Sequence, residues 1–97
     1  MAYLTITRFQ GNPDHLTADY HRSAQVMDEV GHDHGLILHA GARTDEGLLV
    51  INLWPSKDNS EAAAADTRRL AELERATDSI ELLEREHHEV DRYLIRP

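Results

Sequence analysis

Cysteine is absent from the sequence, so the chain has neither a disulfide framework nor thiol chemistry. Cationic residues are few: 10 Lys and Arg stand against 18 Asp and Glu, which gives a formal net charge of −8 at pH 7. Nucleic-acid phosphates require a basic face, and we therefore expect no nucleic-acid partner. Aromatic residues make up only 5% of the chain, so its core must be mostly aliphatic.

Long apolar runs are also missing. No segment approaches the roughly 20 apolar residues of a membrane-spanning helix, and we expect no membrane association. The first residues, MAYLTITRF, alternate like a strand and lack the apolar core of a signal peptide, so a cytoplasmic protein is expected. A chain of 97 residues suffices for one modest core, and residues 1–97 should form a single domain.

Residues 35–56, GLILHAGARTDEGLLVINLWPS, are the most informative stretch of the chain. They predict two apolar strands joined by a tight turn and followed by a helix, with Ser56 as its N-cap. Asp45 and Glu46 suit the central positions of a type I turn. Gly47 can adopt the left-handed conformation that completes a three-residue hairpin loop.

The N-terminal segment predicts a strand and then a helix. Residues 2–9 alternate in the manner of a strand, and Gly11 ends it. Asn12-Pro13 then supplies an N-cap and a proline for the first helical position. Apolar residues recur every three or four positions from there, and we expect this helix to end at Gly31.

The C-terminal half predicts a second helix and a last strand. The helix is expected over residues 57–75, with a buried side formed by Ala62 to Ala65, Leu70 and Leu73. A short helical turn near residues 79–84 should follow. Residues 86–95 alternate as the last strand.

The predicted order is β-α-β-β-α-β. This order indicates an α+β, ferredoxin-like fold: a four-stranded antiparallel sheet with two helices on one face. The third strand carries Leu49, Ile51 and Leu53 on one side and is apolar on the other except for Asn52. A strand apolar on both faces is buried on both, yet the helices cover only one. We therefore expect a homodimer that forms through the sheet.

The chain resembles the dimeric α/β-barrel superfamily, and within it the small proteins similar to antibiotic-biosynthesis monooxygenases. Residues 35–56 carry the resemblance, with a Trp-x-Ser before the second helix; FQGNPDHLTADY and HHEVDRYLI support it. The resemblance implies that two ferredoxin-like subunits pair their sheets into a barrel, each keeping a pocket between sheet and helices. The superfamily includes cofactor-independent quinone-forming monooxygenases, haem-degrading enzymes, polyketide cyclases and isomerases.

Haem degradation is not expected here. Haem-degrading relatives carry an Asn on the first strand and a haem-ligating His on the second helix. This chain has Thr5, Thr7 and Arg8 in the first strand, and residues 57–75 contain no histidine. A strand-to-helix glycine loop for phosphate is absent as well, so we expect no haem, flavin or other cofactor.

Candidate site residues lie on the third strand and on elements beside it. Trp54 shares a strand face with Asn52 and Val50, and an indole with an amide at a pocket wall can hold a planar aromatic substrate. Each of these residues can instead belong to the core. Tyr20, on the apolar stripe of the first helix, is either core or a further pocket residue.

His39 is the candidate general base, because a partly buried imidazole can exchange protons near neutral pH. A three-residue hairpin loop pairs Ala40 with Asn52 and places His39 on the face opposite Trp54. A two-residue loop pairs His39 with Asn52 and places it on the same face as Trp54. The turn residues favour the first register, so His39 is expected to line the barrel rather than the pocket.

Two groups on the last strand complete the candidate site. His88 is a further catalytic candidate and Tyr93 a further substrate-binding candidate, although they lie on opposite faces of the expected strand. The segments His32-Asp33-His34 and His87-His88-Glu89 also contain metal-ligand residue types. Their spacing does not make the side chains converge, so no metal is expected.

These observations lead to a small homodimeric enzyme that acts without a cofactor on a small aromatic or polyketide-like substrate. Cofactor-free oxygenation needs a base that deprotonates the substrate, so that the carbanion reduces dioxygen. A cyclase or isomerase of the same fold needs a similar base and an oxyanion donor but no oxygen. A non-catalytic dimer that binds a small ligand is the alternative from another class.

Overall fold

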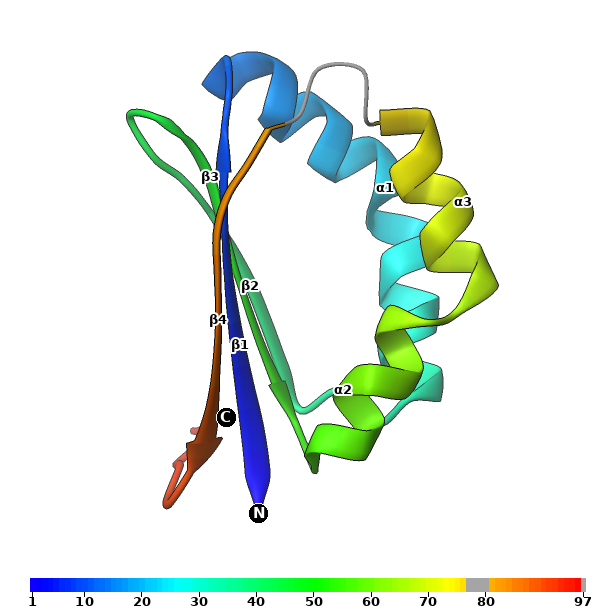
Figure 1. The fold of residues 1–97 in the computed structure, drawn as a ribbon, viewed down its shortest axis with the longest axis vertical. Helices are drawn as coiled ribbons and strands as arrows, with labels where there is room; N and C mark the ends of the chain where they lie inside the picture. The colour runs from blue at the N-terminus through cyan, green and yellow to red at the C-terminus, as the bar shows by residue number, and fades with distance from the viewer. Residues whose placement is uncertain (77–80, 97) are drawn as a thin grey trace.

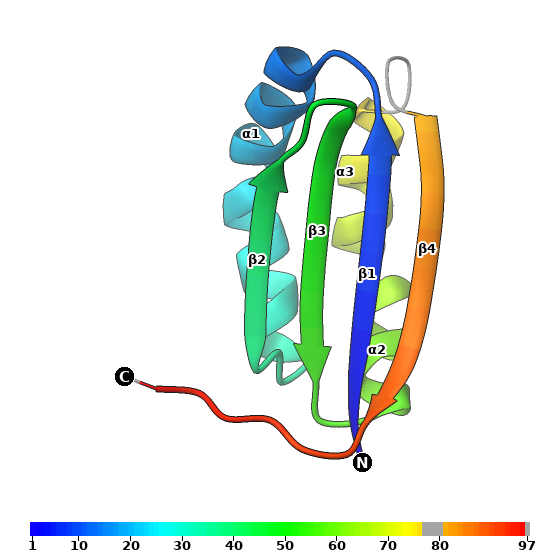
Figure 2. The same cartoon turned by 90° about the vertical axis from the view of Figure 1, so that its left-hand side faces the viewer.

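The computed structural model places residues 1–76 and 81–96, and it has the expected ferredoxin-like α+β fold. The elements follow in the order β-α-β-β-α-α-β: β1 (Ala2–Gln10), α1 (Pro13–Asp33), β2 (Leu38–Arg43), β3 (Gly47–Trp54), α2 (Lys57–Ala64), α3 (Thr67–Ala76) and β4 (Glu81–Val90). The antiparallel sheet has the strand order β2-β3-β1-β4. All three helices lie on one face of this sheet (Figures 1 and 2). No helix within the described residues is long and apolar enough to span a membrane.

Helix α1 begins where the sequence predicts and ends two residues later. The Asn12 side chain caps the first turn, accepting from the backbone N–H groups of residues 14 and 15 at 2.9 and 3.2 Å. Gly31 lies within the helix, and its missing side chain leaves room for Leu36, whose Cδ2 would lie 2.7 Å from a Cβ there. The helix ends instead in a Schellman motif, with Gly35 at φ +79° and the Leu36 N–H on the Gly31 carbonyl at 2.9 Å.

The hairpin between β2 and β3 has a different register from the one expected. Thr44 and Gly47 pair with each other, so the loop holds two residues and His39 pairs with Asn52. Gly47 does not complete a left-handed turn. It lies in the sheet beside β1, where a Cβ would stand 2.0 Å from the carbonyl oxygen of Phe9. The register therefore depends on this close approach, and His39 faces the helices on the side of Trp54.

The single helix expected over residues 57–75 is broken into α2 and α3. Ser56 caps α2 as predicted, accepting from the Asn59 N–H at 3.2 Å. Asp66 caps α3 in the same way, accepting from the Arg68 N–H at 2.9 Å. Because the chain turns at this second cap, only Ala63 of the alanine block is buried, and Leu70 is exposed.

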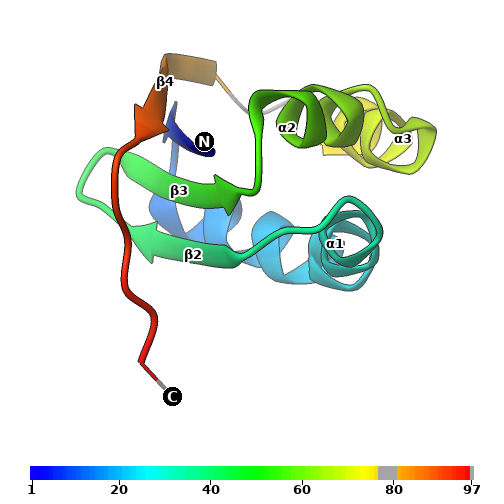
Figure 3. The same cartoon turned by 90° about the horizontal axis from the view of Figure 1, so that it is seen from below.

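Strand β4 starts earlier and ends earlier than expected. Residues 81–84 are strand rather than a helical turn, and residues 79 and 80 lie outside the described part of the chain. The strand ends at Val90, so residues 91–95 are not part of it. Seen from below, residues 91–96 run along the side of the sheet that faces away from the helices (Figure 3).

The core lies at one end of the space between sheet and helices. Trp54 packs there with Val30 of α1 and Ala63 of α2, all three buried. Leu16 and Leu48 are buried as well. Part of the remaining space between the two layers is a cavity.

Candidate active site

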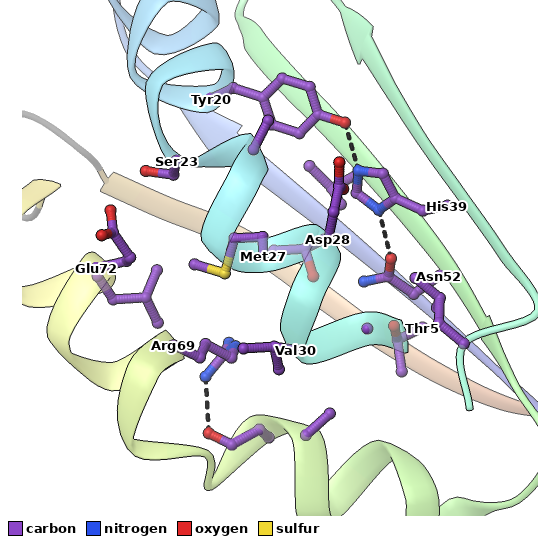
Figure 4. A pocket seen from close by; sticks show the side chains of 18 of the residues that line it. Thr5, Tyr20, Ser23, Met27, Asp28, Val30, His39, Asn52, Arg69 and Glu72 are labelled. Carbon is purple, nitrogen blue, oxygen red and sulfur yellow. Dashed lines mark hydrogen bonds between the residues drawn. The ribbon is translucent and has the colours of Figure 1, made fainter. Parts of the chain in front are cut away.

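A cavity of about 240 Å³ lies between the sheet and the helices (Figure 4). Every strand contributes to its wall, and so do all three helices. The wall is mostly apolar, and its polar groups are few and come from different elements. Among the lining residues are Thr5, Phe9, Tyr20, Met27, His39, Val50, Asn52 and Trp54. A largely apolar hollow with a few converging polar groups is the usual form of a small-molecule site.

Three of the polar side chains form a continuous hydrogen-bonded chain. The Tyr20 hydroxyl bonds His39 Nε2, and His39 Nδ1 bonds Asn52 Oδ1 at 2.6 Å (Figure 4). An amide oxygen only accepts, so Nδ1 carries the proton and Nε2 accepts from the phenol. This hydrogen-bonded series therefore runs from a phenol through an imidazole to an amide, and the amide oxygen holds the proton on Nδ1.

The positions of these three side chains follow from the pairing of β2 with β3 and from the packing of α1 on the sheet. His39 and Asn52 are cross-strand partners on β2 and β3, so their side chains lie next to each other on the same face. Tyr20 reaches them from α1, stacked on the His39 ring at 5.6 Å between centroids. Gly41 makes room for it, because a Cβ there would lie 2.5 Å from the Tyr20 hydroxyl.

The environment of Tyr20 keeps the phenol protonated. Burial raises the pKa of Tyr20, and the negative charge of Asp28 on the same helix raises it further. Both effects disfavour the phenolate, so at neutral pH Tyr20 is a hydrogen-bond donor. Asp28 also lines the cavity (Figure 4).

The structure brings together five of the seven residues that the sequence nominated. Tyr20, His39, Val50, Asn52 and Trp54 all line the cavity. The expectation that His39 faces away from Trp54 is wrong, because the two-residue hairpin loop places it on the cavity side. Trp54 serves the core as well, since this residue is only 6% exposed.

The other two nominated residues lie outside the cavity. His88 pairs with Leu4 and so lies on the face of the sheet opposite the helices. Tyr93 follows the end of β4 and is half exposed, so it does not line the cavity. The neighbouring histidine, His87, does face the cavity, stacked on Tyr3 at 5.8 Å between ring centroids. Only the register of β4 against β1 distinguishes the two histidines.

The histidine-rich segments do not gather around a common point. His34 bonds Asp66 at 2.9 Å and thereby links the end of α1 to the start of α3. His87 and His88 point to opposite faces of the sheet. Within the described residues, no group of three or more His, Asp or Glu side chains is arranged to hold a metal ion.

Two arginines lie at the part of the cavity wall made by α3 and β4. Arg69 and Arg85 both line the cavity, and the Arg69 Nη1 donates to the Ala64 carbonyl at the end of α2, at 2.9 Å (Figure 4). Burial lowers the pKa of Arg69, and the positive charge of Arg85 lowers it further. Sequence reasoning missed both residues, since nothing in the pattern of α3 or β4 separates them from solvated charges.

Solved structures of low sequence identity share this fold. No protein-family model matches the chain, and no curated protein matches it. SnoaB, a cofactor-independent oxygenase from Streptomyces nogalater, is 18% identical over 98% of both chains, with a TM-score of 0.75. A proposed antibiotic biosynthesis monooxygenase from Chloroflexus aurantiacus is 15% identical over 99% of this chain and all of the other, with a TM-score of 0.72. MupZ from Pseudomonas fluorescens is 10% identical over 90% of this chain and 70% of its own, with a TM-score of 0.74.

Proposed function

The chain has the fold of SnoaB and of antibiotic biosynthesis monooxygenase-like proteins, and on this basis we propose that it is a homodimeric, cofactor-independent oxygenase. Its substrate is a small planar aromatic or polyketide-like molecule with an acidic C–H group, such as an anthrone. The hydrogen-bonded chain Tyr20–His39–Asn52 in a largely apolar cavity is the observation that carries the proposal.

The first step is removal of a proton from the substrate. Tyr20 takes the substrate proton on its oxygen while its own proton moves to His39 Nε2, so the phenol is re-formed and the imidazole becomes imidazolium. Asn52 Oδ1 keeps its bond to the Nδ1 proton and steadies the ring in both states. The re-formed Tyr20 hydroxyl then donates to the substrate oxygen on which the negative charge collects.

The second step is reaction of the carbanion with dioxygen. The carbanion gives one electron to dioxygen, and the two radicals combine to a peroxide anion. This anion takes the proton back from the imidazolium through Tyr20. Loss of water from the hydroperoxide leaves a carbonyl, so the net change is that a CH₂ group and O₂ become C=O and H₂O. The apolar walls of the cavity favour this chemistry, because they exclude water from the carbanion.

Oxygen consumption tests the proposal directly. The purified protein, treated with a chelator, should consume one equivalent of dioxygen for each equivalent of anthrone converted to anthraquinone. Replacing His39 with alanine should lower this turnover about 100-fold or more, whereas the same change at His88, on the other face of the sheet, should leave it within about twofold. Conversion of a substrate without oxygen uptake would instead indicate a cyclase or isomerase. Saturable binding without turnover would indicate a binding protein.

The dimer is part of the proposal. The face of the sheet opposite the helices carries apolar side chains that no helix of the same chain covers, and a second copy would bury them (Figure 1). These residues are Leu4, Ile6, Leu49 and Ile51, each partly exposed in the single chain. Sedimentation at micromolar concentration should give a dimer. Ile51→Asp should yield a monomer or an unfolded chain, because it places a charge in the interface; a stable wild-type monomer would contradict the proposed assembly.

A further inference from the structure

Arg69 and Arg85, the two arginines of the cavity wall, differ from the arginines that form ion pairs. Arg8, Arg22, Arg43, Arg68 and Arg75 each form an ion pair with a carboxylate. No ion pair joins Arg69 or Arg85 to a carboxylate within residues 1–75 and 84–96. Both residues line the cavity, Arg69 from α3 and Arg85 from β4, and the positive charge of Arg85 acts on Arg69.

Within the described residues, one side-chain hydrogen bond holds Arg69. Its Nη1 donates to the carbonyl of Ala64, the last residue of α2, whose oxygen has no partner within that helix. This single bond orients the guanidinium and leaves its other N–H groups available to the cavity (Figure 4). A guanidinium that is already oriented loses little freedom when it binds a planar anion.

The acidic residues of the cavity wall do not neutralise this pair. Asp19 is bonded to Arg22, and Glu72 is bonded to Arg75, which holds the pKa of Glu72 below its usual range. Asp28 acts on Tyr20, on the α1 side of the cavity (Figure 4). The wall is therefore polarised: Asp28 acts on the phenol, and at α3 and β4 lie two cations that have no carboxylate partner among residues 1–75 and 84–96.

We propose that Arg69 and Arg85 form a carboxylate-binding subsite, and that the ligand of this cavity is a planar aromatic molecule bearing a carboxylate. A carboxylate between the two guanidiniums would relieve their mutual repulsion and accept charge-assisted hydrogen bonds from both. The aromatic part of the ligand would then extend over the apolar wall toward Tyr20 and His39. This inference rests on the proposed function only for the chemistry at Tyr20, because anion binding at the arginines requires no turnover.

A matched pair of probes tests the subsite by calorimetry. The wild-type protein should bind 2-naphthoate at least about tenfold more tightly than 2-naphthamide, which has the same shape without the charge. Arg69→Gln should weaken 2-naphthoate binding about tenfold and change 2-naphthamide binding less than about twofold. Arg69→Lys, which keeps the charge and loses the fork, should fall between the two. Arg85→Gln should act in the same direction but more weakly, because its side chain is exposed.

The control is Arg92→Gln, which removes the same charge from an exposed position after β4. It should leave both affinities unchanged. Equal affinity of the wild type for the two probes, no binding of 2-naphthoate, or an equal loss of both probes in Arg69→Gln would each overturn the subsite. A charge preference without oxygen uptake on any anthrone would refute the oxygenase and leave the subsite standing. Oxygen uptake on a neutral anthrone, with no preference for the charged probe, would support the oxygenase and refute the carboxylate subsite.

Discussion

Adding one methyl group at Gly41 should separate catalysis from stability. The Cβ of Gly41→Ala would lie 2.5 Å from both Cζ and the hydroxyl of Tyr20. Non-bonded heavy atoms need about 3.5 to 4.0 Å, so the ring must move by about 1 Å. The movement breaks the hydrogen bond between Tyr20 and His39, which is the link on which the proposed proton transfer depends.

The cost in folding free energy should be small. Losing the hydrogen bond costs about 0.5 to 1.5 kcal/mol. Gly41 is not among the glycines with positive φ, so alanine fits the backbone and restricts the unfolded chain, a gain of about 0.4 to 1 kcal/mol. The two effects nearly cancel, and urea unfolding followed by Trp54 fluorescence should change by no more than about 1 kcal/mol. Turnover should fall about 100-fold, as expected for a displacement of about 1 Å.

Two further measurements test whether Gly41→Ala acts through the hydrogen bond between Tyr20 and His39. Nitrogen NMR should find the His39 proton on Nδ1 in the wild type and a mixture of tautomers in Gly41→Ala, whatever the reaction is. In a Tyr20→Phe background, Gly41→Ala should have no further effect on turnover, because the hydroxyl is already gone. Wild-type turnover in Gly41→Ala would refute the role of the Tyr20–His39 bond. A loss of more than about 3 kcal/mol would show that the ring cannot move.

The remaining predictions concern other parts of the chain. His39→Ala should lower oxygen uptake by about 100-fold or more, with His88→Ala unchanged; equal losses would place the reaction elsewhere. Gly47→Ala should cost several kcal/mol in chemical denaturation or prevent folding, because its Cβ would meet the Phe9 carbonyl oxygen at 2.0 Å and backbone cannot give way; a variant of normal stability would contradict this close approach. Side-chain hydrogen bonds from Arg68 and then His34 hold the pKa of Asp66 well below its usual range, so its contribution to stability is present above about pH 4 and is lost as pH falls below that value. Asp66→Asn should therefore lower the melting temperature at pH 7, with the difference shrinking below pH 4; a difference independent of pH would exclude the ionised pair as its cause.

Features that depend on neighbouring residues in the chain were predictable from the sequence. Asn12 and Ser56 cap their helices through backbone groups two or three residues away, so the signals are complete within a few letters. Asp66 carries the same signal, but the alanines before it continue the helical pattern and conceal the break. The alternation of apolar residues within a strand is also a local signal, and it predicts the strands and the residues that share a face with Trp54.

Features that depend on contacts between distant segments of the chain could not be predicted from the sequence. The choice between a two-residue and a three-residue loop depends on how closely Gly47 approaches Phe9 in β1, which the turn residues do not encode. That choice alone decides the side on which His39 lies. The same holds for His87 and His88, because a register shift at the end of β1 and the true start of β4 determine which of them faces the helices.

The cavity also determines how substitutions in its wall and bound ligands change the stability of the protein. The cavity takes part of the space between sheet and helices where a small protein normally keeps its hydrophobic core, and no described side chain is completely shielded from solvent. Larger apolar residues introduced into the cavity wall should therefore raise the melting temperature while they abolish binding, as in other proteins that trade stability for activity. A bound ligand would complete the core in the same way, so the protein with its ligand is the more stable molecule. A screen of small molecules for those that raise the melting temperature would then select by the size and shape of the missing core, without any assumption about the reaction.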